Sequence, residues 1–104
     1  MILVDVTECR ERVAEAERLL DRDSDDASRI ATEILAQHPA IGDEVSSIAH
    51  RVLAVTALRR GNTDEASRSI DEAVAAGERS HVDVVLGKAL MTAMAVAIRR
   101  IRSL

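Results

Sequence analysis

The sequence predicts an all-α fold, and three observations indicate it. Apolar residues recur with the 3.6-residue period of an amphipathic helix along most of the chain. Helix-capping residues and glycines divide the chain into segments of helical length. Phe, Tyr and Trp are absent from all 104 residues, so the core must be aliphatic, as in closely packed helices. A chain of this length is expected to form a single domain, residues 1–104.

The first two helices are predicted over residues 5–20 and 25–37. Asp5 and Glu8 have the spacing of a capping box at the start of the first helix. Pro39 ends the second, because proline cannot continue a helix. The residues expected to face inward are Val6, Cys9, Val13, Ala16 and Leu20 on the first helix, and Ala27, Ile30, Ala31, Ile34 and Leu35 on the second.

The next two helices are separated by the clearest turn in the chain, "RRGNTDEA". The third predicted helix covers residues 43–60, and Gly61 ends it as a C-cap glycine. Asn62 and Glu65 then form a capping pair that starts a fourth helix, and this helix is expected to end at Gly77. Its inward-facing residues are predicted to be Ala66, Ile70, Ala73 and Val74.

A fifth helix is predicted over residues 80–102, where Ser80 and Asp83 have capping-box spacing. Its stretch 84–98 is apolar nearly all round, with Lys88 as its one charge, and is too short for a membrane span of about 20 residues. Such a helix must be buried on several sides, so we expect a homodimer. The residues expected to associate are Val85, Leu86, Leu90, Met91, Met94 and Ile98. The breaks between helices are predicted at residues 21–24, 38–42, 61–62 and 77–80.

The central helix pair resembles a tetratricopeptide repeat, a helix–turn–helix unit of about 34 residues. The residues at the family's spacings are His50, Leu53, Ala54 and Ala57 on the first helix, and Ala66, Ile70 and Ala73 on the second. A weaker copy upstream carries Ala27, Ala31, Ile34 and Pro39 at similar offsets. The resemblance divides the chain into a degenerate repeat at 8–41, a clearer repeat at 47–80 and an additional helix at 81–102.

The resemblance implies helix hairpins stacked as a short right-handed superhelix that binds another protein or a peptide segment on its concave surface. The first helix of each hairpin lines that surface in this family. The partner-binding residues it implies are Arg12, Ile48, Arg51, Val55 and Arg59. Small Ala residues would let the paired helices approach, while Leu53 and Ile70 fill the groove between them. In bacteria such arrays often form the N-terminal regulatory part of a larger signalling protein, such as a diguanylate cyclase or a transcriptional activator.

An alternative function rests on His50. The stretch "AHRVLAV" is similar to the phosphoryl-accepting helix of histidine-containing phosphotransfer domains, which are four-helix bundles of about this length. That family has Lys and Gly where this chain has Leu53 and Ala54. Without the cation, a phosphoryl group loses electrostatic support, so we favour His50 as a packing residue.

Other function classes find little support in the composition. A net charge of −4 argues against a nucleic-acid binder. The three histidines lack metal-ligand spacing, and no phosphate loop, nucleophile motif or paired catalytic carboxylates appear, so we expect neither an enzyme nor a bound cofactor or metal. The opening residues do not read as a signal peptide, and nearly all basic residues are Arg, which suggests a bacterial, cytoplasmic protein.

Overall fold

The computed structural model describes residues 6–104, and all regular secondary structure in this range is α-helical. The helices are α1 (Val6–Leu19), α2 (Ser24–Gln37), α3 (Asp43–Arg59), α4 (Thr63–Ser80) and α5 (Asp83–Arg102). The predicted all-α class is therefore confirmed. The first three helices lie within one or two residues of their predicted bounds. Asp5 and its predicted cap lie outside the described residues.

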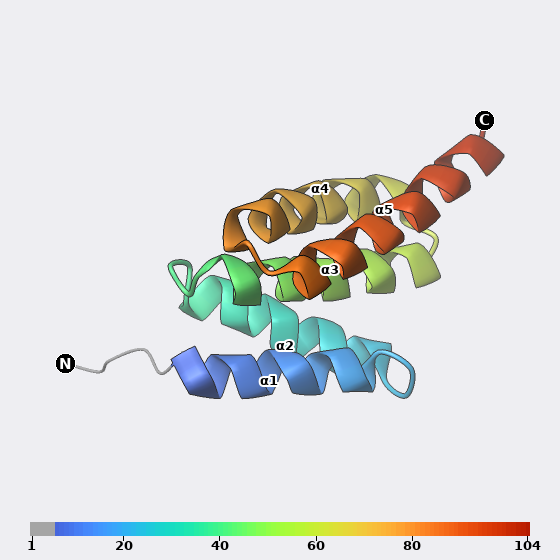
Figure 1. Cartoon of the computed structure of the whole chain (residues 1–104). Coiled ribbons are helices and arrows are strands. Elements are labelled where there is room, and N and C mark those ends of the chain that lie inside the picture. Colours follow the sequence, from blue (N-terminus) through green and yellow to red (C-terminus); the bar gives the residue numbers. More distant parts are fainter. Residues whose placement is uncertain (1–5) are drawn as a thin grey trace.

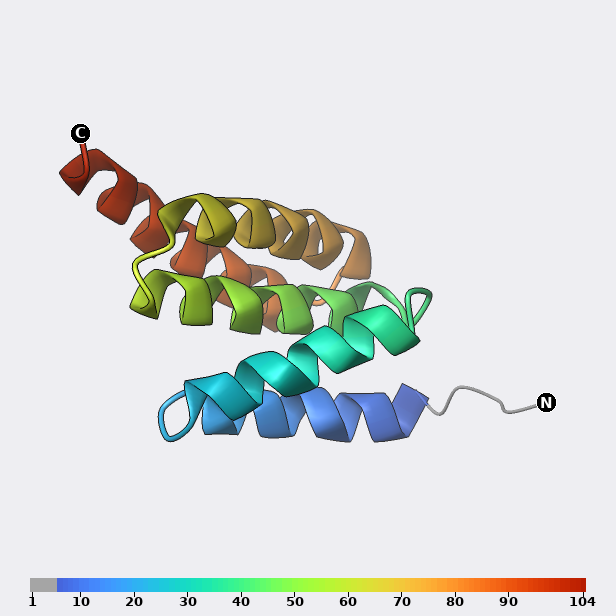
Figure 2. The same ribbon diagram turned by 180° about the vertical axis from the view of Figure 1, so that it is seen from behind.

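The helices form two hairpins and a fifth helix (Figure 1). α1 packs on α2 and α3 packs on α4, while α3 also contacts α2, α1 and α5. α1, α3 and α5 run in the same direction, and α2 and α4 return between them. Figure 2 shows α2 and α4 on the face turned away from α5. The first helices of the two hairpins and α5 therefore share one side of the molecule.

The core consists of two aliphatic clusters that meet along α3. One cluster lies between α1, α2 and α3, and the other between α3, α4 and α5. Most predicted inward residues are buried, including Val13, Ala27 and Ile34. The prediction for Val6 is wrong, because its side chain is 46% exposed at the first turn of α1.

Small side chains set the close contact between α3 and α4. Ala54 on α3 and Ala66 on α4 are completely buried, and Ile70 is buried beside them, as predicted. Leu53 was expected in the same contact, and this expectation is wrong: Leu53 is half-buried and packs on the first cluster. Leu53 and Ala54 face different clusters because neighbouring residues of a helix point about 100° apart around its axis.

The turn between α3 and α4 is built as predicted. Gly61 has a φ of +79°, a left-handed conformation that favours glycine. The Asn62 N–H donates to the carbonyl of Ala57 (2.9 Å), which closes the end of α3 in the pattern of a Schellman motif. The Asn62 Oδ1 then accepts the N–H of Glu65 (3.1 Å), and so starts α4.

The connection between α4 and α5 differs from the prediction. α4 continues through Gly77 to Ser80, and the break lies at 81–82, where His81 takes a φ of 57°. The Ser80 hydroxyl donates to the carbonyl of Gly77 (2.7 Å) and accepts the N–H of Val82 (3.1 Å). The predicted Ser80–Asp83 capping box is therefore wrong, because the serine hydroxyl is used in the turn itself.

Gly77 also has a different role from the one predicted. It lies inside α4 and is buried, and a Cβ atom at this position would lie 3.2 Å from the Cα of Leu86 on α5. The glycine thus permits α5 to approach the α4 backbone closely, and it does not end a helix.

Candidate functional site

A groove runs along α3 between α1 and α5, and we call it the α1–α3–α5 groove. Three hollows open onto it, with volumes of about 290, 400 and 370 Å³. The first lies toward the start of α3, and the other two lie side by side along its second half, one toward α1 and one toward α5. Arg51 lines all three, so it marks the middle of the groove. The α3 residues along the groove are Ile48, Arg51, Val55 and Arg59.

Charged side chains from three helices meet at the middle of the groove. Arg51 on α3 donates to Glu17 on α1 (3.3 Å) and to the Oγ1 atom of Thr92 on α5 (3.0 Å). The Lys88 ammonium on α5 lies 3.7 Å from the same Glu17 carboxylate. The Arg51 and Glu17 side chains are 24% and 21% exposed, so solvent screens this pair less than an exposed one. These contacts link α1 to α5 across α3.

Arg59 closes one end of the groove. Its guanidinium donates to the carbonyl of Leu20, just after the last turn of α1, and lies 3.1 Å from the carboxylate of Asp21. Asp21 is 88% exposed, so this ion pair adds little stability. The bond to the carbonyl matters more for geometry, since it satisfies a backbone group beyond the end of α1.

The hollow between α3 and α5 has a distinct electrostatic character. Its lining includes three arginines, Arg51, Arg59 and Arg99, together with apolar side chains, and no acidic residue lines it. Within the described residues, the Arg99 side chain has no ion-pair partner. The remaining lining residues are Val55, Leu58, Met91, Thr92 and Ala95, and of these Met91 is 72% exposed. This hollow therefore combines positive charge with an apolar surface.

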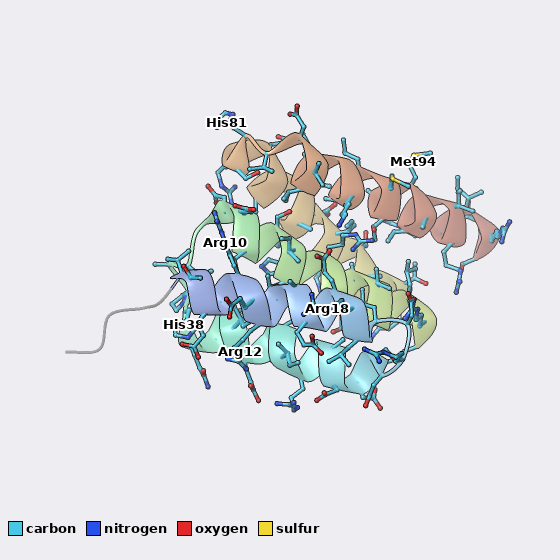
Figure 3. The ribbon with its side chains drawn as sticks, turned by 60° about the horizontal axis from the view of Figure 1, so that its bottom comes forward. Arg10, Arg12, Arg18, His38, His81 and Met94 are labelled. Carbon is cyan, nitrogen blue, oxygen red and sulfur yellow. The ribbon has the colours of Figure 1, made fainter. Side chains whose placement is uncertain are left out.

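Four of the five predicted partner-binding residues lie together in the groove, and Arg12 does not. Arg12 pairs with Glu33 on α2 (2.9 Å), on the side of α1 away from α5 (Figure 3). The pKa of Glu33 is lowered, first by a hydrogen bond from Arg29 and then by one from Arg12. The Arg12 guanidinium is thus paired within the chain, with Glu33, and does not line the groove.

Sequence reasoning missed several charged groove residues, among them Glu17, Lys88 and Arg99. Lys88 had a visible indication, because it is the one charge in an otherwise apolar stretch of the fifth helix. Arg99 gave no distinct indication, because an arginine in the last turn of a helix ordinarily complements the helix dipole. Glu17 had no indication in the sequence, since its role depends on how α1 faces α5.

The structure also bears on His50, the residue of the alternative function. His50 is half-buried on α3, and burial lowers its pKa, while the charge of Glu72 on α4 acts in the opposite direction. A nearby carboxylate would repel a phosphoryl group, which weakens the phosphotransfer hypothesis. Figure 3 shows His38 and His81 at separate corners of the molecule. Among residues 6–104, no group of three or more His, Cys, Asp or Glu side chains could hold a metal ion.

The predicted self-association residues divide between two sides of α5. Val85 is buried and Leu86 is half-buried against Gly77, so the prediction is wrong for these two. Both point into the protein because α5 is apolar on its inner as well as its outer side. The other four, which are Leu90, Met91, Met94 and Ile98, are exposed.

Comparisons with known proteins give no assignment. No family model, curated protein or solved structure matches this chain. Within the described part of the chain, no helix has the length and apolar character needed to cross a membrane.

Proposed function

We propose that this chain is a protein-interaction module of tetratricopeptide type, whose α1–α3–α5 groove binds a peptide segment of another protein. The observation that carries the proposal is the group of three adjoining hollows along α3, lined by Ile48, Arg51, Val55 and Arg59. Helices that share one side of stacked hairpins form the concave binding surface in such repeats.

The dimensions of the groove favour an elongated ligand. The three hollows share Arg51 and adjoin one another, so a compact small molecule would fill one of them and leave the others empty. A peptide can place different side chains in different hollows, and each apolar side chain is then buried against the groove.

The charges favour a peptide that carries at least one carboxylate. The α3–α5 hollow presents Arg59 and Arg99 beside the apolar Val55 and Ala95, with no acidic residue in its lining. A guanidinium binds a carboxylate through two parallel hydrogen bonds, which adds both energy and orientation. We therefore propose that an Asp or Glu next to an aliphatic residue occupies this hollow.

A display library of random peptides, selected on the immobilised protein, tests the proposal. Enriched peptides are expected to contain an acidic residue beside an aliphatic one. Their affinity should fall about tenfold for Arg99→Glu, the loss of one charge-assisted pair. Arg102→Glu is the matched control, because it makes the same charge change three residues away on the same exposed end of α5.

Higher salt should weaken the binding, since partly exposed charges are screened. The proposal fails if no peptide is enriched, or if the enriched peptides bind Arg99→Glu as tightly as they bind the unaltered protein.

A further inference from the structure

The outer face of α5 carries a regular apolar pattern that the fold leaves uncovered. We call this pattern the α5 seam. Its members are Val84, Gly87, Met91, Met94, Ile98 and Ile101. The side chains are well exposed, for example 72% for Met91 and 68% for Ile101. Figure 3 shows Met94 pointing away from the other helices. Seven of the eight large apolar side chains exposed in the described residues lie between Val84 and Leu104, so exposure is concentrated here.

The spacing of the α5 seam is that of a helix-packing surface. Its members alternate between steps of three and four residues, the a and d positions of a heptad repeat. The opposite side of α5 has the same kind of spacing in its four buried residues, Val85, Ala89, Thr92 and Val96, which pack into the protein. α5 is therefore built with two packing faces, and the fold uses one of them.

Gly87 also indicates that a helix from outside this chain packs on α5. Glycine within a helix lowers its stability, so it needs a reason. At Gly77 the reason is the Cα of Leu86 at 3.2 Å, but a Cβ at Gly87 would have nothing within 4 Å. The described structure thus offers no internal cause for this glycine. A partner packing on the seam would supply one, because a missing side chain lets a large one enter.

We propose that the α5 seam is a two-fold interface on which α5 of a second copy of this chain packs antiparallel. The steps between seam members, 3, 4, 3, 4 and 3, read the same from either end. Two antiparallel copies therefore align every member with another member, and the one small member, Gly87, meets the large Ile98. The layers are Val84 against Ile101, Gly87 against Ile98, and Met91 against Met94.

Charge selects the antiparallel direction. The last turn of α5 carries Arg99, Arg100 and Arg102, whereas Asp83 lies in its first turn and Glu78 near the end of α4. A parallel pair would place the arginines of both copies side by side. An antiparallel pair places them beside the acidic end of the partner helix and also opposes the two helix dipoles. A closed two-fold pair is also the commonest form of soluble oligomer.

Sedimentation equilibrium tests whether a second copy of the chain packs on the α5 seam. The protein is expected to have twice the 11.3 kDa chain mass. Met91→Glu combined with Met94→Glu should give a monomer with unchanged helicity, because both side chains are exposed. Val6→Glu is the matched control, since it charges an exposed apolar residue on α1 and should leave the dimer intact. A protein that is monomeric at every concentration, or a dimer that survives the double substitution, overturns the proposal.

Gly87→Leu tests the layer arrangement. The added side chain meets open space in a single copy, so the fold should persist. In the proposed pair it meets Ile98 of the second copy, and the dissociation constant should rise about tenfold or more. An unchanged dissociation constant rules out this layer.

The direction of packing is measured with a spin label at Arg102→Cys in a Cys9→Ala background. The two labels should lie about 30 Å apart in an antiparallel pair, because a helix of this length spans about that distance. A parallel pair would bring them to about 10 Å, the spacing between packed helix axes. The short distance would overturn the antiparallel arrangement.

Discussion

The same methyl group should have opposite effects at two glycines of this fold. Gly77→Ala is expected to destabilise the protein, and Gly87→Ala to stabilise it. Both glycines lie inside helices, Gly77 in α4 and Gly87 in α5. Each alanine should therefore gain about 0.5–1 kcal/mol from its higher helix propensity. The difference between the two variants then reports on the surroundings.

The surroundings of Gly77 leave too little space for a methyl group. A Cβ there would lie 3.2 Å from the Cα of Leu86 and 3.2 Å from the Oγ of Ser47. The first is a backbone atom that cannot rotate away, and the second is held by a 2.7 Å hydrogen bond to the carbonyl of Ala73. Overpacking of this kind costs about 1–3 kcal/mol, so we expect a net loss of up to about 2 kcal/mol. Gly87 should keep its full gain, because nothing lies within 4 Å.

Urea unfolding followed by circular dichroism measures this difference. The Met91→Glu, Met94→Glu background removes any contribution from association through the α5 seam. With a slope of about 1 kcal/mol per molar urea, a difference of 1–3 kcal/mol separates the midpoints by about 1–3 M. If Gly77→Ala proves as stable as Gly87→Ala, the close approach of α5 to α4 is refuted.

Three further substitutions test the fold more locally. Ala66→Leu should lower the free energy of unfolding by about 1–3 kcal/mol through overpacking at the α3–α4 contact, and an unchanged urea midpoint would contradict that register. Asn62→Ala should cost about 1 kcal/mol by removing the cap on the N–H of Glu65, with Asn62→Asp as a control that retains the acceptor. Burial lowers the pKa of His50 below its ordinary 6.5, so the unfolded chain binds the proton more readily. The stability from neutral His50 is thus present above about pH 6.5 and is lost as the pH falls through the lowered pKa. His50→Gln should flatten this dependence, and equal slopes would argue against it.

Local sequence features predicted the helices well, because caps and turns depend on neighbouring residues. Gly61 and Asn62 act as expected, since a left-handed glycine followed by a capping side chain leaves few alternatives. The α4–α5 connection was mispredicted for a physical reason. The Ser80 hydroxyl can form hydrogen bonds either within the turn or to a backbone N–H at the start of α5, and sequence spacing does not indicate which of the two forms.

The groove was predicted in part, from one helix. The spacing of Ile48, Arg51 and Val55 places them on one face of α3, and that face does line the groove. Arg12 shows the limit of this reasoning, because its place on the first helix of a hairpin does not determine whether its side chain turns toward α5 or α2. Contacts between helices that are distant in sequence, such as the one between Glu17 and Lys88, depend on the angle at which the hairpins pack. The sequence pattern does not give this angle.

The division of the core along α3 has a thermodynamic consequence. In the described residues, the α1–α2 hairpin packs on α3 and has no backbone contact with α4 or α5. Because the two core clusters are joined only through α3, we expect this hairpin to open while α3, α4 and α5 stay folded. Across the groove, α1 reaches α5 through the Glu17–Lys88 pair.

A ligand bound in the groove would contact α1, α3 and α5 at once. It would therefore stabilise the packing of the α1–α2 hairpin against the unit formed by α3, α4 and α5. Amide hydrogens of α1 and α2 should exchange faster than those of α3 in the free protein. When a ligand binds, exchange of the α1 and α2 amide hydrogens should slow by a factor set by the ratio of the ligand concentration to its dissociation constant. The exchange rate of the first hairpin would therefore measure how much of the groove is occupied.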